Sequence, residues 1–111
     1  KVKALGAHHV IDHRTQDVAA TVRALTGKAG VQVVFEHVGA QTFDTSLKVL
    51  QRGGRLVTCG ATTGGNVSLS LHAVFFKSLS ILGSTMGQKG DLRQILRLFD
   101  QGRFRPVLDR A

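Results

Sequence analysis

Short continuous apolar runs alternate along this chain with longer stretches in which apolar residues recur at helical spacing. The apolar runs lie at residues 31–35, 56–59 and 79–85, and each ends in glycine or other small residues. Parallel α/β sheets show this rhythm, and their loops at the carboxyl ends of the strands face the ligand. The pattern therefore predicts an α/β fold with a parallel sheet.

Four strands are predicted, at residues 8–12, 30–37, 55–59 and 79–85. The strand at 30–37 is nearly continuous in apolar residues, so we expect it to be buried on both faces. Thr15 is predicted to cap a helix that ends at Gly27, and Phe43, Leu47 and Leu50 form the inward stripe of a second helix at about residues 41–51. Two further helices are predicted, one at residues 71–78 and one that Asp91 begins and Gly102 ends.

The chain is predicted to be part of a longer protein. Its first residues are typical of the last turns of a helix, with Lys3 in the final turn and Gly6 as C-cap, and a domain seldom starts inside a helix. No G-x-G-x-x-G motif follows any predicted strand. We therefore expect these 111 residues to be the second half of a dinucleotide-binding domain, without its phosphate-binding loop.

Composition narrows the class of protein. The length allows one domain, the hydrophobic content of 42% argues against disorder, and no apolar run approaches the ~18 residues of a membrane span. A soluble protein that does not bind membranes is expected. Cys59 is the single cysteine, which excludes an intrachain disulfide and favours a small buried hydrophobe in a reducing, cytoplasmic compartment.

The net charge of +8 raises the question of nucleic-acid binding. The 15 basic residues form no dense run, and the chain has no Tyr or Trp with which to stack bases. The charge pattern therefore argues against a nucleic-acid partner.

The sequence gives little support for a metal site or for acid–base catalysis. His9 and His13 have i, i+4 spacing, but a strand across Val10 and Ile11 would hold their rings roughly 13 Å apart, which excludes a shared ion. Glu36 and His37, adjacent on a strand, point to opposite faces. No catalytic residue and no metal ligand is predicted in this chain.

Four runs, at residues 3–12, 33–39, 54–61 and 80–87, resemble the medium-chain dehydrogenase/reductase superfamily, and most of all its zinc-type alcohol dehydrogenases and quinone oxidoreductases. The resemblance implies a Rossmann-like doubly wound parallel sheet of strand order 3-2-1-4-5-6, of which this chain supplies strands 3 to 6. It implies an NAD(P)-dependent oxidoreductase that moves a hydride between a nicotinamide cofactor and an alcohol, carbonyl or quinone. Any zinc, and the determinants of the small-molecule substrate, would lie in the parent protein's other domain.

The resemblance also implies positions for the cofactor. The loop of His37, Val38 and Gly39 would lie beside the riboses of the cofactor. The nicotinamide carboxamide would contact backbone groups of Gly60, Ala61, Ser84, Thr85 and Met86. His13 and Arg14 would lie near the 2′-phosphate of NADP, where some quinone oxidoreductases carry a Tyr, so NADP is slightly favoured over NAD. One alternative is that Gly39, Gly60 and Gly83 are turn or strand-end glycines with no ligand. The other is a solvated turn at His13 and Arg14.

Two functions stay open at this point: part of an oxidoreductase, or a non-catalytic nucleotide-binding or dimerisation module. We expect the isolated chain to turn over no substrate and to bind the cofactor poorly, because the phosphate-binding loop is missing. The uncharged strand from Leu79 to Met86 is expected to be a sheet edge that pairs with its copy in a homodimer. The alternative is an edge that the tail at residues 104–111 shields.

Overall fold

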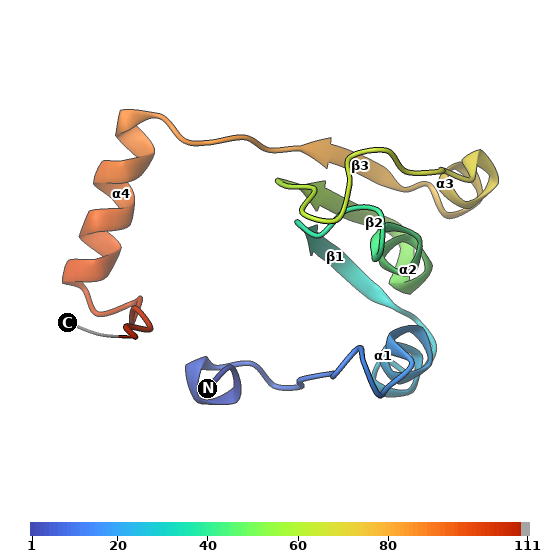
Figure 1. The fold of residues 1–111 in the computed structure, drawn as a ribbon, viewed down its shortest axis with the longest axis horizontal. Helices are drawn as coiled ribbons and strands as arrows, with labels where there is room; N and C mark the ends of the chain where they lie inside the picture. Colours follow the sequence, from blue (N-terminus) through green and yellow to red (C-terminus); the bar gives the residue numbers. More distant parts are fainter. Residues whose placement is uncertain (110–111) are drawn as a thin grey trace. The chain divides into compact units, whose positions relative to one another are not determined.

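The computed structural model describes residues 1–109, and Figure 1 shows its ribbon. The chain divides into two compact units, residues 11–84 and residues 1–10 together with the segment from Thr85 onward. The first unit carries the sheet and three helices. The outermost part of the tail predicted at 104–111, residues 110 and 111, lies outside the described residues.

The sheet is parallel and has three strands in the order β1-β2-β3. These are β1 (Val31–Glu36), β2 (Leu50–Thr58) and β3 (Ser80–Gly83). In register, Leu56 of β2 lies between Val34 of β1 and Ile81 of β3. The predicted α/β class is confirmed, and β3 is an edge strand as expected.

The start of β2 differs from the prediction. The strand begins at Leu50, and Leu50 pairs with Val31 whereas Arg55 already pairs with Val33, so the intervening residues of β2 bulge out of the ladder. Gly53 has φ +72°, a left-handed conformation that glycine adopts at little cost. Gly53 and Gly54 therefore lie in a bulge within one strand that is longer than the predicted one.

The predicted strand at residues 8–12 is wrong, because no strand forms there. Asp12 instead closes a local turn: its carboxylate accepts from the Arg14 N–H at 3.0 Å, and its N–H donates to Gln16 Oε1 at 2.9 Å. A strand gains its hydrogen bonds only from a neighbouring strand, and none of the described strands pairs with this segment. The local turn supplies the hydrogen bonds that a strand would have needed.

Three helices accompany the sheet: α1 (Val18–Leu25), α2 (Phe43–Val49) and α3 (Leu71–Lys77). Helix α2 packs on β1 and β2, α3 packs on β2, and α1 packs on α2. The cap of α1 is Asp17, whose carboxylate accepts from the Ala20 N–H at 3.0 Å, and not Thr15 as predicted. Thr15 belongs to the Asp12 turn, where its N–H donates to the Asp12 carbonyl.

The core lies between α2 and the sheet. Phe43, Leu47, Leu50, Leu56 and Leu79 are its buried members. The predicted stripe of α2 is therefore correct, although Leu50 belongs to β2.

Two burial predictions are wrong. Val33 is 48% exposed and Phe35 65% exposed, so β1 has one open face in place of two buried ones. The reason is that the described helices cover only the face that carries Val34 and Glu36. Cys59 is also exposed, because β2 ends at Thr58 and Cys59 begins the following loop.

The second unit contains a short 3-10 helix, η1 (Lys3–Leu5), and helix α4 (Lys89–Asp100). Gly6 caps η1 with φ +107°, as predicted. Asp91 does not cap α4 but sits at its third position, where it forms a reciprocal capping box with the N-cap Gln88. In the described part of the chain no helix combines the length and apolar character needed to cross a membrane.

Candidate functional site

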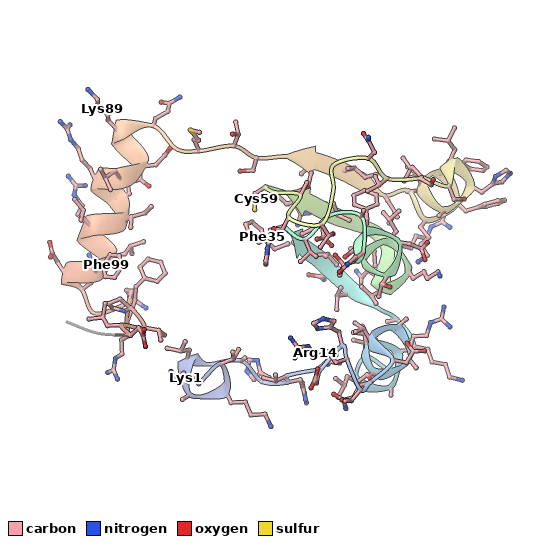
Figure 2. The ribbon with its side chains drawn as sticks, viewed as in Figure 1. Lys1, Arg14, Phe35, Cys59, Lys89 and Phe99 are labelled. Atoms are coloured by element: carbon pink, nitrogen blue, oxygen red, sulfur yellow. The ribbon has the colours of Figure 1, made fainter. Side chains whose placement is uncertain are left out.

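The carboxyl ends of the three strands meet at one edge of the sheet. Glu36, Thr58 and Gly83 are in register there, so the residues that follow each strand are neighbours. Figure 2 shows Phe35 of β1 and Cys59, which follows β2, close to this edge. The edge brings together six of the predicted cofactor residues: His37, Val38, Gly39, Gly60, Ala61 and Ser84.

Glu36 organises the first loop of this edge. Its side chain is only 4% exposed, and Oε1 accepts from the backbone N–H groups of Val38 at 2.6 Å and Gly39 at 3.1 Å. On the other side, Ser46 Oγ donates to Oε2 at 2.5 Å and the Thr42 hydroxyl donates to Oε2 at 2.9 Å. One buried carboxylate thus joins the end of β1, the turn after it and helix α2.

These donors determine the charge state of Glu36. Burial taken alone raises the pKa of the carboxyl, whereas the hydrogen bonds from Ser46, Gly39, Val38 and Thr42 lower it. The hydrogen bonds outweigh burial, and the pKa lies below its ordinary value of 4.5. Glu36 is therefore held as a carboxylate at neutral pH.

The loop after β2 is fastened to the loop after β1. Thr62 Oγ1 donates to the His37 carbonyl at 3.1 Å, and Thr63 Oγ1 donates to the Val38 carbonyl at 2.8 Å. The backbone adds a bond from the Thr63 N–H to the same Val38 carbonyl at 2.7 Å. The two loops therefore form one hydrogen-bonded surface.

Gly39 is required where these loops meet. Its φ is +92°, and a Cβ atom there would lie 2.4 Å from the Gly64 carbonyl oxygen. Any other residue would push the second loop away. The packing of the two loops alone therefore explains this glycine.

The hydrogen bonds also show which groups a ligand can use. In the loop 37–39, Glu36 already binds the N–H groups of Val38 and Gly39, and the threonines bind the carbonyls of His37 and Val38. By contrast, no hydrogen bond within the described residues uses the N–H of Gly60 or of Ala61. The first loop is thus suited to shape a ligand site, and the second has donors left to contact a ligand.

The other four predicted cofactor residues are His13, Arg14, Thr85 and Met86. His13 lines a cavity of about 490 Å³ together with Glu36, His37 and Val38, so the fold brings it to the same end of the sheet. Arg14 does not line this cavity, and its N–H is bound to the Asp12 carboxylate. Thr85 and Met86 follow Ser84 but belong to the other unit.

Sequence reasoning missed Glu36 as an organising residue. The signal was present: an acidic residue ends an apolar run, the pair Val38 and Gly39 follows, and hydroxyl residues come at Thr42 and Ser46. The spacing of Thr42 and Ser46 places both hydroxyls on one face of a helix.

Metal binding finds no support in residues 1–109. No group of three or more His, Cys, Asp or Glu side chains lies close enough there to hold an ion.

Comparisons with known proteins agree with this geometry. A family model described as zinc-binding dehydrogenase matches residues 1–101. The crotonyl-CoA reductase of Streptomyces collinus is 30% identical over 106 residues, which cover 90% of this chain and 24% of that protein.

Two solved structures show the same fold. The alcohol dehydrogenase of Aeropyrum pernix has a TM-score of 0.83 at 35% identity, covering 91% of this chain and 29% of that one. A crotonyl-CoA carboxylase/reductase in complex with NADP has a TM-score of 0.85 at 29% identity, covering 96% and 32%. The chain thus spans 24% to 32% of the length of these three relatives.

We expect Glu36→Gln to lower the free energy of unfolding by about 1–3 kcal/mol at pH 7, because neutral Gln cannot match the carboxylate as an acceptor for four donors. The lowered pKa means that the unfolded state takes up a proton first as the pH falls. The stabilisation is therefore fully present above pH 4.5 and is lost as the pH falls through the folded-state pKa, so the two proteins should converge in acid. Urea unfolding between pH 7 and pH 3 measures this.

The matched control is Asp44→Asn on the same helix. Asp44 forms only an exposed ion pair with Lys48, and its removal should change stability by less than about 1 kcal/mol. Equal effects of the two substitutions would contradict the role given to Glu36.

Proposed function

Because this chain belongs to the zinc-binding dehydrogenase family of the medium-chain dehydrogenase/reductase superfamily, we propose that it forms part of the NAD(P)-binding domain of an oxidoreductase. The parent protein would transfer a hydride between the nicotinamide ring and a small alcohol, carbonyl or quinone substrate. The thiol of Cys59 is exposed and single, which favours a reducing, cytoplasmic compartment.

One observation carries this proposal: at the carboxyl edge of a parallel sheet, Thr62 and Thr63 of the loop after β2 bond to the loop 37–39. Within residues 1–109 the N–H groups of Gly60 and Ala61 are left without a hydrogen-bond partner. Ligands of doubly wound sheets bind at this edge. The carboxamide of a nicotinamide ring needs hydrogen-bond donors in fixed positions, and the N–H groups of a rigid backbone supply them. A Cβ at Gly60 would lie 3.1 Å from the His37 carbonyl oxygen, so the two loops leave little room for a side chain there.

Each part of the edge has a separate task in this proposal. The bound cofactor supplies the hydride chemistry. Gly60 and Ala61 orient the carboxamide, and Ser84 extends the same edge from β3. Thr85 and Met86 follow Ser84 in the sequence and stay candidate carboxamide contacts. The loop of His37, Val38 and Gly39 shapes the ribose site, because most of its backbone polar groups are already bonded.

NADP is slightly favoured over NAD as the cofactor. His13 shares its cavity with His37, and an imidazole there can donate to the 2′-phosphate. A solved relative is a complex with NADP. Arg14 stays a candidate phosphate ligand through its side chain, since only its backbone N–H is tied to Asp12. The described residues hold no set of ligands for zinc.

We also propose that the parent protein is a homodimer joined through β3. This strand is a sheet edge, contains no charged residue, and leaves Ile81 37% and Leu82 46% exposed. An uncharged edge is a ready partner for another strand, and antiparallel pairing with a second copy needs only one such surface.

NADPH added to the ¹⁵N-labelled chain should shift the amide resonances of His37, Gly60 and Ala61. The affinity should be weaker than micromolar, because the phosphate-binding loop is not in the chain. His13→Ala should weaken NADPH by about two- to tenfold and leave NADH unchanged, since only NADPH carries the 2′-phosphate. NMR titration measures both.

The control is His72→Ala, which removes a histidine from α3 that does not line the His13 cavity. Shifts confined to the amino ends of the strands, at Gly30 and Leu50, would overturn the assignment of the cofactor edge.

Ile81→Lys should convert the dimer into a monomer, because a lysine on an edge strand opposes pairing with a second copy. Sedimentation of the chain and the variant at high concentration is the measurement. Leu71→Lys on α3, where the side chain is 70% exposed, places the same charge outside the edge and should leave the dimer intact. A monomeric chain, or a dimeric Ile81→Lys variant, would contradict the edge-strand interface.

A further inference from the structure

A second cavity lies at the amino ends of the strands, opposite the edge described above. Its volume is about 840 Å³, and it includes Gly30 before β1 and Leu50 at the start of β2. Its apolar floor comes from Ala20 and Ala24 of α1 together with Val49 and Leu50. Five basic residues line it: Arg23, Lys28, Lys48, Arg52 and Lys77.

The positive charge of this cavity is only partly balanced. Lys48 pairs with Asp44 at 2.6 Å, and Arg52 donates to the Phe76 carbonyl at 3.0 Å. Of the described residues that line the cavity, none is acidic. Arg23 and Lys28 are therefore the cations whose N–H groups an anionic ligand can recruit, and Lys77 adds its positive charge beside them.

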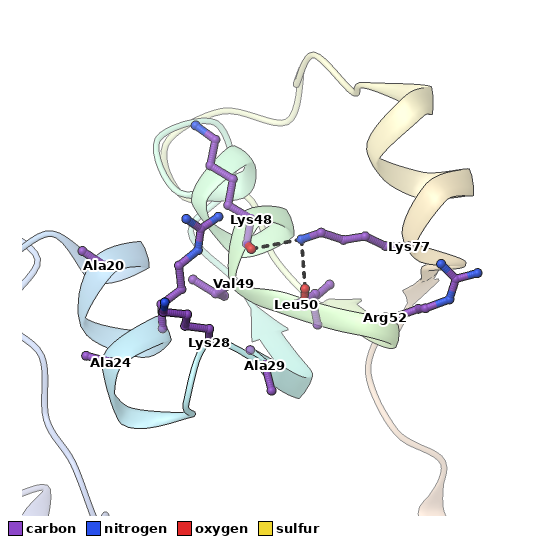
Figure 3. Close-up of a pocket in the computed structure, with 11 residues that line it drawn as sticks. Ala20, Ala24, Lys28, Ala29, Lys48, Val49, Leu50, Arg52 and Lys77 are labelled. Carbon is purple, nitrogen blue, oxygen red and sulfur yellow. Dashed lines mark hydrogen bonds between the residues drawn. The ribbon is translucent and has the colours of Figure 1, made fainter.

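Lys77 is held in a fixed position. Its Nζ donates to the carbonyls of Leu47 at 3.3 Å, Lys48 at 3.1 Å and Leu50 at 2.9 Å, and Figure 3 shows the last two bonds. Burial, and next the charge of Arg23, lower the pKa of Lys77. An anion placed between the two cations would relieve this repulsion.

Lys28 is kept in an unfavourable backbone conformation. Its φ is +73°, directly after Gly27 at +57°, and its N–H donates to the Arg23 carbonyl at 2.7 Å to close the end of α1. A residue with a Cβ is strained in this region, whereas glycine adopts it at little cost. The sequence thus keeps an ammonium group at the cavity where glycine would be easier for the backbone.

We propose that this cavity binds a phosphate-bearing small molecule, with its phosphate among Arg23, Lys28 and Lys77 and its apolar body on the alanine floor. The volume is within the ~300–1,000 Å³ of small-molecule sites, and an apolar lining with a few placed charges is their usual character. A nucleic acid would need an extended basic stripe, whereas these cations line one cavity.

Pyrophosphate and adenosine diphosphate are the probes, titrated into the full chain by calorimetry and NMR. We expect saturable binding that shifts the amides of Lys28, Ala29 and Gly30, with adenosine diphosphate binding more tightly because its base reaches the apolar floor. Lys28→Gly should weaken both probes at least about fivefold while the free energy of unfolding stays equal or rises. Arg23→Gln should weaken them similarly.

The matched control is Arg93→Gln, an arginine on helix α4 in the other unit, which should bind both probes like the unaltered chain. Unchanged affinity in Lys28→Gly would overturn the proposal. So would binding of both probes at the loops 37–39 and 60–61 alone, or binding of RNA with no saturable binding of pyrophosphate.

Discussion

A buried charge in a protein is costly unless every lone pair that faces the interior is bonded, and Glu36 meets this requirement in a way that builds the cofactor edge. Its donors come from the turn at Val38 and Gly39, from the N-cap Thr42 of α2, and from Ser46 within that helix. The carboxylate therefore fixes both where α2 begins and how the chain leaves β1. Gly39, held in this turn, then receives the Gly64 carbonyl, which brings the second loop into place. The positions of the available N–H groups at Gly60 and Ala61 depend on this series of contacts.

The elements that local pattern determines were predictable. The three strands and the helix of Phe43 and Leu47 follow from apolar periodicity, which needs no knowledge of distant residues. The conformation of residues 8–12 was not predictable from local pattern. A strand exists only where a neighbouring strand pairs with it, and Asp12 forms a competing turn. The prediction that Phe35 and Cys59 are buried was wrong for a related reason, because exposure depends on which layers cover the sheet.

The candidate site was predictable in position but not in its chemistry. The resemblance placed His37, Gly60 and Ser84 at strand ends, and the fold brings these ends together. Which backbone groups are left for a ligand depends on Thr62 and Thr63, and no sequence pattern showed those bonds. The basic cavity was not predicted from the sequence either. Its cations are scattered through the sequence from Arg23 to Lys77, and the scatter that argued against nucleic acid concealed a cluster that forms only on folding.

The cofactor edge depends most directly on the charge of Glu36, and the pKa of its carboxyl group in the folded chain is the measurement that tests this dependence. NMR titration with ¹³C-labelled glutamate gives this pKa from the shift of the carboxyl carbon. The four hydrogen-bond donors predict a pKa below the ordinary value of 4.5. A pKa above 4.5 would mean that burial outweighs the donors, and it would contradict the view that a bonded carboxylate holds the edge together.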